Sequence, residues 1–213
     1  MDIMNLFLWS ALACYSSSFI PQLVTNFKHR STAGLSDLFL LLYSIAYLSM
    51  QYYVFCLDLP LAYKVMVPFE ASLNVLLVSQ RFYYHRFAWN NFFSLGIVIS
   101  CIVSLLALPW AIYNPLQAGQ FFGWVATIVF SVNQLPQIVK LYRSKTTHGF
   151  SFWFVSFIAL AMALELVGGL AKELPLQTIV MAVRGIVVYC VFCVQFWLYR
   201  KKDQSCLNVE PNI

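Results

Sequence analysis

Seven long apolar stretches leave this chain one main choice of architecture. A helix that crosses the hydrocarbon core of a bilayer needs about 20 apolar residues, and each stretch is long enough to do so. Only 10% of the 213 residues are charged, against about 25% in an ordinary soluble domain. The sequence therefore predicts an all-α integral membrane protein with seven transmembrane helices. The predicted spans are residues 4–27, 37–57, 60–82, 91–113, 118–142, 151–171 and 174–199.

Lysine and arginine residues gather on one side of these spans. Ten follow the first, third, fifth or seventh span, and the opposite side holds only Lys64 and Lys172. Because loops rich in lysine and arginine stay in the cytosol, this bias predicts an outside or lumenal N-terminus and a cytosolic C-terminus. The ten residues are Lys28, Arg30, Arg81, Arg86, Lys140, Arg143, Lys145, Arg200, Lys201 and Lys202.

The type of membrane is predicted from weaker signals. The chain is compact, it contains no Asn-x-Ser/Thr sequon, and its tail has no obvious lysosomal sorting signal. These features favour a bacterial inner membrane over a lysosomal or vacuolar membrane. The net charge of +5 does not indicate a nucleic-acid partner, because the basic residues form short clusters between apolar spans. Membrane lipids are the expected surroundings.

The sequence repeats itself at an offset of 115 residues. The register holds without a gap from the first span of each copy to its third. Spans 1–3 and 5–7 are therefore two copies of one three-helix unit, and span 4 has no copy. The matched residues include Trp9 with Trp124, Pro21-Gln22 with Pro136-Gln137, Gly34 with Gly149, Ser36 with Ser151, Leu59-Pro60-Leu61 with Leu174-Pro175-Leu176, and Gln80 with Gln195.

This repeat predicts the domain organisation. Residues 1–90 form the first three-helix bundle, 91–115 a linker helix, 116–202 the second bundle and 203–213 a cytosolic tail. Because a single linker helix returns the chain to its starting side, the two bundles share one orientation. Such parallel 3+1+3 repeats occur in transporters whose substrate binds between the halves near the middle of the membrane.

The paired Pro-Gln motifs carry a resemblance to a known family. With the Gly34-Leu35-Ser36 and Gly149-Phe150-Ser151 turns that follow them, they make the chain similar to the PQ-loop family over roughly residues 4–200. That family includes cystinosin, exporters of cationic amino acids and bacterial relatives, and its fold is shared with SWEET sugar transporters. The resemblance implies a seven-helix fold and membrane transport.

Pro21-Gln22 and Pro136-Gln137 are the predicted hinge or gating residues. A proline inside a helix frees the carbonyl four residues before it and lets the helix bend, and a nearby glutamine amide can bond to such a carbonyl. One interpretation is a static kink. The repetition at equivalent points favours a hinge at which the cytosolic ends of spans 1 and 5 swing.

Three ionisable residues lie well inside the predicted spans: Glu70, Glu165 and Arg184. Charge in lipid is costly unless it is paired or faces a wet cavity, so each is a candidate site residue. Arg184 can neutralise only one carboxylate, and desolvation favours the protonated form of the other. We expect Glu70 to carry a proton or to receive a substrate's ammonium group. The alternative is a structural Glu–Arg bridge.

Other polar residues accompany these charges. Tyr63 and Asn74 lie at helical spacing from Glu70, so a phenol, a carboxylate and an amide are expected on one face. Asn133 shares a face with Gln137, and either a pocket role or a helix–helix hydrogen bond fits it. Tyr189 replaces Asn74 in the second copy and is a candidate pocket residue.

The predicted function is secondary transport of a small amino acid, or a related zwitterion or cation, coupled to protons by alternating access. A SWEET-like sugar facilitator is one alternative, although a neutral sugar does not require intramembrane charges. A peptide-binding sorting receptor like the KDEL receptor is another, because Arg184 can hold a carboxylate. No nucleophile–base pair, phosphate-binding loop or intramembrane metal motif occurs, so we predict no enzymatic activity, cofactor or metal.

Overall fold

The computed structural model describes residues 3–85, 92–147 and 150–207, and in this part of the chain every regular element is a helix. Arg86, Gly149 and residues 208–213 lie outside the described residues, as do the side chains from Arg200 onward. The helices are α1 (Ile3–Lys28), α2 (Asp37–Cys56), α3 (Leu61–His85), α4 (Phe92–Tyr113), α5 (Pro115–Val132), α6 (Leu135–Ser144), α7 (Phe152–Ala171) and α8 (Leu176–Leu207).

Six helical stretches of the described chain are long and apolar enough to cross a membrane, and one of them joins α5 and α6 as Pro115–Ser144. Helix α1 is not one of these six stretches. Its 26 residues nevertheless extend about 39 Å, and it packs along α7 inside the bundle. The prediction of an all-helical, seven-span membrane fold is confirmed.

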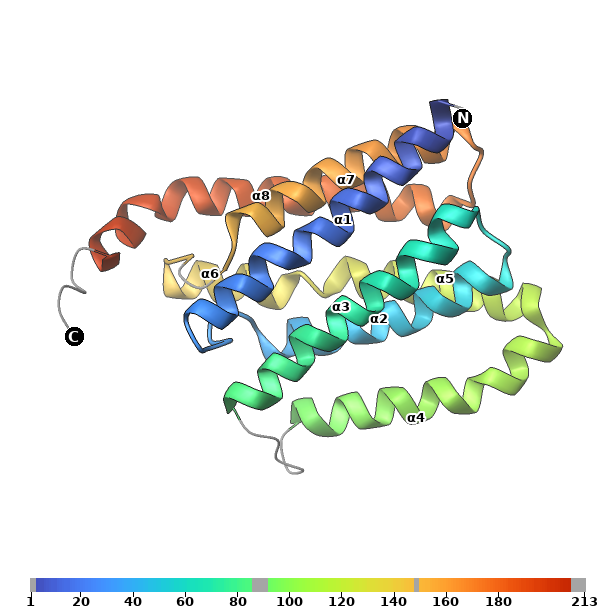
Figure 1. The fold of residues 1–213 in the computed structure, drawn as a ribbon, viewed down its shortest axis with the longest axis horizontal. Helices are drawn as coiled ribbons and strands as arrows, with labels where there is room; N and C mark the ends of the chain where they lie inside the picture. Colours follow the sequence, from blue (N-terminus) through green and yellow to red (C-terminus); the bar gives the residue numbers. More distant parts are fainter. Residues whose placement is uncertain (1–2, 86–91, 148–149, 208–213) are drawn as a thin grey trace.

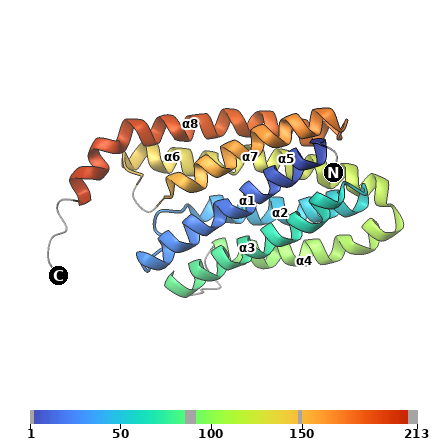
Figure 2. The same ribbon diagram turned by 45° about the horizontal axis from the view of Figure 1, so that its top comes forward.

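Each set of three helices packs in the same way. Helix α3 lies between α1 and α2, and α8 lies between α5 and α7. The two sets meet through two extensive interfaces, α1 against α7 and α2 against α5. Figure 2 shows α1 beside α7 at the join. The third helix of each copy is thus the inner member of its set, as a structural repeat requires.

The two interfaces between the sets use equivalent positions, but the small and the large side chain are exchanged between the two helices. A Cβ added at Gly123 in α5 would lie 2.5 Å from the ring of Tyr53 in α2. A Cβ added at Gly168 in α7 would lie 2.9 Å from Leu8 in α1. Leu8 and Gly123 are equivalent at the 115-residue offset, and so are Tyr53 and Gly168. A glycine therefore allows close helix approach at both interfaces, but on opposite members of the pair.

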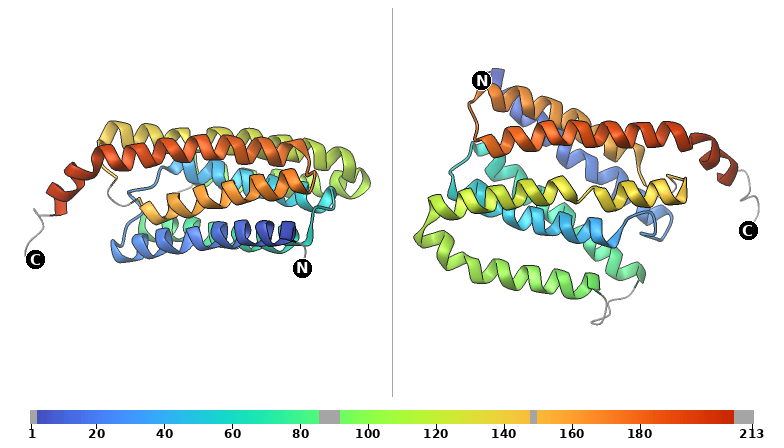
Figure 3. Two further views of the ribbon diagram at one scale, coloured as in Figure 1. Left: turned by 90° about the horizontal axis from the view of Figure 1, so that it is seen from above. Right: turned by 180° about the vertical axis from the view of Figure 1, so that it is seen from behind.

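Helix α4 lies along one edge of the bundle, next to α2 and α5 (Figure 3). Most of its surface is exposed, and its exposed side chains are large and apolar, as at Leu105, Leu106 and Ile112. In a membrane protein such a surface faces lipid. This position fits the predicted linker helix, although the limits proposed for the two bundles stay a prediction.

One end of the bundle carries the basic loops. The C-terminal ends of α1, α3, α6 and α8 all lie at the left in Figure 1, and the N-terminus lies at the right. We call this left-hand end the basic end, because Lys28, Arg30, Arg81, Lys140 and Arg143 lie on or next to these helix ends. The alternation agrees with the predicted topology, and the sidedness in a membrane stays a prediction.

Equivalent hydrogen bonds support the basic end in both halves. The Gln80 amide donates to the carbonyl of Leu23 at 3.1 Å, and the Gln195 amide donates to the carbonyl of Ile138 at 3.0 Å. Each pair is displaced by 115 residues from the other. Ser36 and Ser151 likewise cap the N-termini of α2 and α7. The predicted repeat is therefore present in the contacts as well as in the sequence.

The fifth predicted span is not one continuous helix. Helix α5 ends at Val132, and α6 begins at Leu135 with Pro136 in its first turn. A proline costs no hydrogen bond there, because the first N–H groups of a helix have no partner inside it. Pro21, the equivalent residue, lies inside the uninterrupted α1. The two Pro-Gln motifs thus occupy different backbone settings.

Candidate functional site

A small cavity of about 60 Å³ lies between the two halves near the middle of the bundle. Its lining comes from both halves and includes five of the predicted site residues: Tyr63, Glu70, Glu165, Arg184 and Tyr189. Sequence reasoning missed other members, of which Tyr15, Tyr43, Gln134 and three methionines, Met50, Met162 and Met181, stand out. The structure therefore brings together both intramembrane carboxyl groups and the one intramembrane guanidinium predicted from the sequence.

Glu165 is held by two phenols. Tyr15 donates to its Oε2 at 2.5 Å, and Tyr63 donates to its Oε1 at 2.7 Å. The residue is buried. Because both carboxyl oxygens have a donor, Glu165 is a satisfied group that fastens α7 to α1 and α3. Tyr63 therefore contacts Glu165 of α7 and not Glu70, its neighbour on α3.

Glu70 is much less completely satisfied. Its Oε2 accepts one hydrogen bond from Tyr47 at 3.2 Å. Its Oε1 is buried and has no hydrogen-bond partner among the described residues. A buried carboxyl oxygen without a donor is energetically costly. Binding of a proton or of a ligand donor at this oxygen would remove that cost.

Arg184 also lacks the partner that charge balance suggests. Its Nε and Nη1 are buried without a hydrogen bond in the described chain. The ion pairs found among the described residues are Lys64–Asp58 and Arg81–Asp37, so Arg184 forms none with Glu70 or Glu165. The alternative of a structural Glu–Arg bridge is therefore not what this conformation contains. Glu165 is instead held by the phenols of Tyr15 and Tyr63.

Tyr189 and Gln134 form a second polar contact at the cavity. The Gln134 amide donates to the Tyr189 hydroxyl at 2.9 Å, and both residues are fully buried. Gln134 lies between the end of α5 at Val132 and the start of α6 at Leu135, and its own backbone is in the right-handed α region. A signal for it was available, because it is an amide two residues before a proline in an otherwise apolar span.

Two predicted site residues are not brought to the cavity. Asn74 instead donates to the Ser44 hydroxyl at 3.0 Å and faces a groove between α2, α3 and α4. Four residues turn a helix by about 400°, which places Asn74 about 40° around and 6 Å along from Glu70. Asn133 is buried at the end of α5, and its side-chain amide has no partner in the described chain.

The glutamines of the two Pro-Gln motifs reach across between the halves. Gln137 accepts from the N–H of Ser36 at 2.9 Å and donates to the carbonyl of Gly34 at 3.0 Å. Gln22 accepts from the N–H of Ser151, also at 2.9 Å. We call this set of contacts the reciprocal clasp. Both glutamine side chains are fully buried.

The clasp corrects one expectation from the sequence. The glutamines were expected to bond to carbonyls freed by their own prolines, but they bond to the loops of the opposite half, and Gln22 also donates to Asn26 of its own helix at 2.8 Å. An extended glutamine side chain reaches the neighbouring backbone, where two N–H groups at the starts of α2 and α7 need acceptors. The motif therefore joins the two halves at the basic end.

Aromatic rings fill the space between the clasp and the cavity. Phe19 lies along α1 between Tyr15 at the cavity and Gln22 at the clasp. Its ring packs against Tyr43, with the centroids 5.9 Å apart, and edge-on against Phe154, at 6.2 Å. This layer and the clasp therefore lie between the cavity and the basic end.

Two equivalent three-helix units around a central polar cavity define a multi-pass membrane protein built on an internal repeat. A model of the PQ loop repeat matches residues 3–63 and again residues 118–178. The two matches are themselves 115 residues apart and cover more than half of the chain. The chain belongs to the PQ-loop repeat family.

Three relatives resemble this chain over much of its length. A cystinosin homolog of Arabidopsis thaliana is 28% identical over 78% of this chain and 68% of its own length. A cystinosin homolog of Dictyostelium discoideum is 26% identical over 67% and 58%. An uncharacterised protein of Schizosaccharomyces pombe is 26% identical over 67% and 53%. This chain therefore spans between about half and two thirds of the length of these relatives, all of which are eukaryotic.

Proposed function

We propose that this protein is a secondary transporter that moves a small amino acid, or a related zwitterion or cation, across a membrane together with protons. Membership of the PQ-loop repeat family and similarity to two cystinosin homologs support membrane transport in general. The observation that carries the finer proposal is Glu70, a buried carboxyl group with one unpartnered oxygen in a cavity between two repeated halves.

Glu70 is the group that links the proton to the substrate. With one weak donor in a dry site, its neutral form is favoured while the cavity is closed and empty. The protonated carboxyl group can donate to a carboxylate oxygen of the substrate, while its other oxygen accepts from the substrate ammonium group. The proton and the substrate then favour each other's binding, which is the coupling that co-transport requires.

The remaining polar residues position this group and complete the cavity. Glu165, held by Tyr15 and Tyr63, fixes α7 against the first half. Arg184 supplies a positive charge for a substrate carboxylate, and Tyr189 is oriented by Gln134. In this assignment Glu165 has a structural role, and Glu70 has the coupling role.

Alternating access supplies the mechanism. The cavity of about 60 Å³ has room for about two water molecules, so the halves must separate to admit a substrate. We propose residues 1–90 and 116–202 as the moving units, 91–115 as their linker and 203–213 as a tail. The break before Pro136 is the larger hinge and Pro21 the smaller, and the reciprocal clasp is the gate at the basic end.

The basic end is proposed to face the cytosol, with the N-terminus outside or in a lumen, because of its excess of lysine and arginine. The predicted preference for a bacterial inner membrane gains no support from the relatives named above, which are eukaryotic. The membrane of residence is best assigned by imaging the tagged protein in its own cell.

A peptide-carboxylate receptor is the second candidate function. The buried guanidinium of Arg184, with Nε and Nη1 unpartnered in the described chain, favours it. Peptide binding without flux would identify this function.

Uptake of a labelled amino-acid mixture into proteoliposomes tests the proposal. We expect the native protein to show uptake that a pH gradient stimulates. Glu70→Gln should lose the stimulation, and Glu173→Gln, a control at an exposed glutamate, should keep it. Absence of uptake by folded native protein would contradict the substrate class. Stimulated uptake that survives Glu70→Gln would contradict the role of Glu70.

A further inference from the structure

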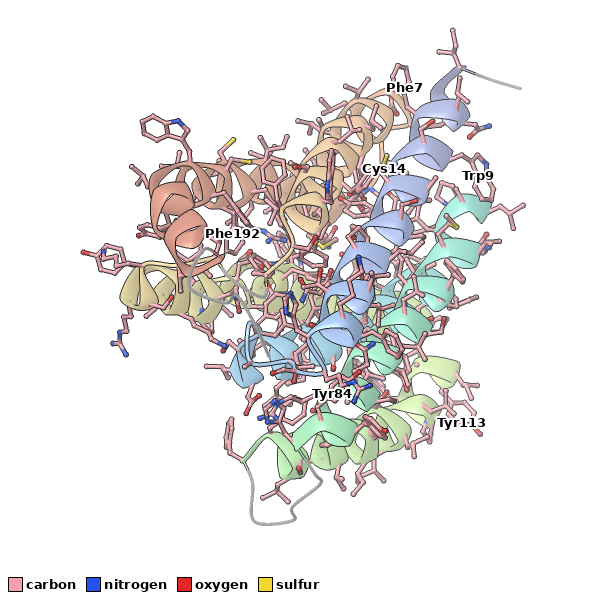
Figure 4. The ribbon with its side chains drawn as sticks, turned by 60° about the vertical axis from the view of Figure 1, so that its left-hand side comes forward. Phe7, Trp9, Cys14, Tyr84, Tyr113 and Phe192 are labelled. Carbon is pink, nitrogen blue, oxygen red and sulfur yellow. The ribbon has the colours of Figure 1, made fainter. Side chains whose placement is uncertain are left out.

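A second, larger cleft of about 770 Å³ lies at the basic end. It is bounded on one side by the loop after α1, the start of α2 and the end of α3, and on the other side by α6. Figure 4 labels Tyr84, which directly precedes His85 and marks this end of α3. The cleft is separate from the central cavity and belongs to both halves, since α6 is part of the second half.

The lining of this cleft is strongly basic. It contains Arg81 and His85 from α3, and Lys140 and Arg143 from α6, with Asp37 as the one carboxylate in the set. Asp37 is already engaged, because Arg81 donates to it through Nε at 2.6 Å and through Nη2 at 2.8 Å. This pair uses two of the five N–H donors of the arginine.

Lys140 and Arg143 are left without a carboxylate in the described chain. The Lys140 ammonium donates to the backbone carbonyls of Ala33 and Leu35, the latter at 2.6 Å. Carbonyl groups orient the ammonium but do not cancel its charge. The cleft therefore carries two uncompensated positive charges next to each other on α6. The complementary ligand is an anion with about two negative charges.

Neutral groups of the cleft also suit an anion. Thr32 lines it and is 1% exposed, and its hydroxyl has no hydrogen-bond partner in the described chain. The N-terminus of α2 opens onto the same space through Ser36, Asp37 and Leu38. A helix N-terminus favours negative charge, and together with the basic side chains it makes a phosphate-binding environment.

The repeat does not require this chemistry. At the 115-residue offset Asp37 corresponds to Phe152, Arg81 to Phe196 and Lys140 to Thr25. The equivalent place formed by α7, α8 and α1 therefore has neither the ion pair nor the lysine, although Lys28 matches Arg143. A cleft with this ion pair and this lysine at only one of the two equivalent places is a feature beyond what the shared fold needs.

We infer that this cleft binds a phosphorylated headgroup, either of a membrane lipid or of a soluble phosphate ester. A phosphomonoester carries about −1.5 to −2 charge, which matches Lys140 and Arg143. Both residues belong to the second half, whereas Arg81, Thr32 and the start of α2 belong to the first. An occupant therefore bridges the halves next to the reciprocal clasp and holds the basic end closed. This inference does not depend on the transported substrate.

Binding to the purified full-length protein in detergent tests the inference. The probes are dioctanoyl phosphatidylinositol 4-phosphate, the soluble inositol phosphate of the same headgroup, and dioctanoyl phosphatidylinositol without the added phosphate. The variant Lys140→Gln/Arg143→Gln removes the uncompensated charges. Lys28→Gln/Arg30→Gln removes the same charge from exposed residues at the same end, outside the cleft lining.

We expect a phosphorylated probe to bind the native protein and the Lys28/Arg30 control alike. Binding should weaken as salt rises and by about tenfold in the cleft variant. Arg143→Gln alone, at an exposed position, should weaken it in the same direction if the double variant fails to fold. Comparable binding of the soluble phosphate assigns a soluble ligand, and binding of the lipid alone assigns a headgroup. Equal affinity for all three probes, or no loss in the cleft variants, would overturn the inference.

Discussion

The two halves fasten their second and third helices together at equivalent points, but with different chemistry. In the first half, Asp37 at the start of α2 forms a bidentate ion pair with Arg81 of α3. In the second half, Phe152 at the start of α7 packs edge-on against Phe196 of α8, with ring centroids 5.4 Å apart. The repeat thus preserves a contact, and its chemistry is free to differ. The polar version lines the basic cleft.

The same contrast recurs near the middle of the bundle. Tyr47 of α2 hydrogen-bonds Glu70 of α3 in the first half. At the equivalent positions, Met162 of α7 lies so close to Gly185 of α8 that an added Cβ would be 1.5 Å from its sulfur. The contact between the second and third helices is apolar in the second half. In the first half the same contact contains a buried carboxyl group. This asymmetry supports the proposal that Glu70 has a functional rather than a structural role.

The reciprocal clasp is the contact that both halves share. Its loss is expected to lower stability the most, because it leaves buried backbone groups without a partner. Gln137→Ala leaves the buried N–H of Ser36 and the carbonyl of Gly34 without their partner. We expect a loss of about 2–6 kcal/mol, from about 1–3 kcal/mol for each of the two orphaned groups, measured by thermal unfolding in detergent. Hydrogen exchange of residues 30–36 should rise as well. Unchanged exchange in this loop would show that the glutamine does not hold it.

Gly185→Ala tests the apolar member of the central pair. The new methyl group overlaps Met162 and should cost about 1–3 kcal/mol of stability. In a Met162→Ala background the same change should cost much less, because the overlapping side chain is gone. The measurement is a double-mutant cycle on the unfolding midpoint. Strictly additive losses would mean that the two positions do not pack as described.

Asp37→Asn gives the smallest expected effect and sharpens the contrast between ion pair and ring pair. The Asp37 side chain is 39% exposed and Arg81 15%, so water and salt screen the pair and the loss should be about 1 kcal/mol. The salt dependence of the unfolding midpoint should fall with it. Phe152→Leu should leave that salt dependence unchanged. Lys64→Gln, at the more exposed Lys64–Asp58 pair, is a control expected to have less effect than Asp37→Asn.

Much of the fold followed from the sequence because it depends on local pattern and on repetition. Apolar length indicated the spans, and the offset of 115 residues indicated the two units. The clasp did not follow, because which backbone Gln22 and Gln137 reach depends on how the halves pack. Asn74 lines the groove between α2, α3 and α4 and not the cavity, because a shared helical face is only an approximate guide over four residues. The break at Asn133–Gln134 was not predicted, because the two Pro-Gln motifs have nearly the same sequence. Pro136 nevertheless lies in the first turn of α6, whereas Pro21 lies inside α1.

The site was predictable to the extent that charge in a membrane is rare. Glu70, Glu165 and Arg184 were identified on that ground, and the structure gathers them around one cavity. Their partners were not predictable. Tyr15 contacts Glu165 across 150 residues of sequence, and neither its position nor its type distinguishes it from the other tyrosines.

The central claim is that Glu70, and not Glu165, exchanges the proton during transport. The most direct measurement follows internal pH with a trapped dye while substrate enters proteoliposomes containing the native protein, Glu70→Gln or Glu165→Gln. We predict substrate-dependent acidification for the native protein, none for Glu70→Gln, and a reduced but present signal for Glu165→Gln, because its loss disturbs packing. Acidification that persists in Glu70→Gln and disappears in folded Glu165→Gln would contradict the account.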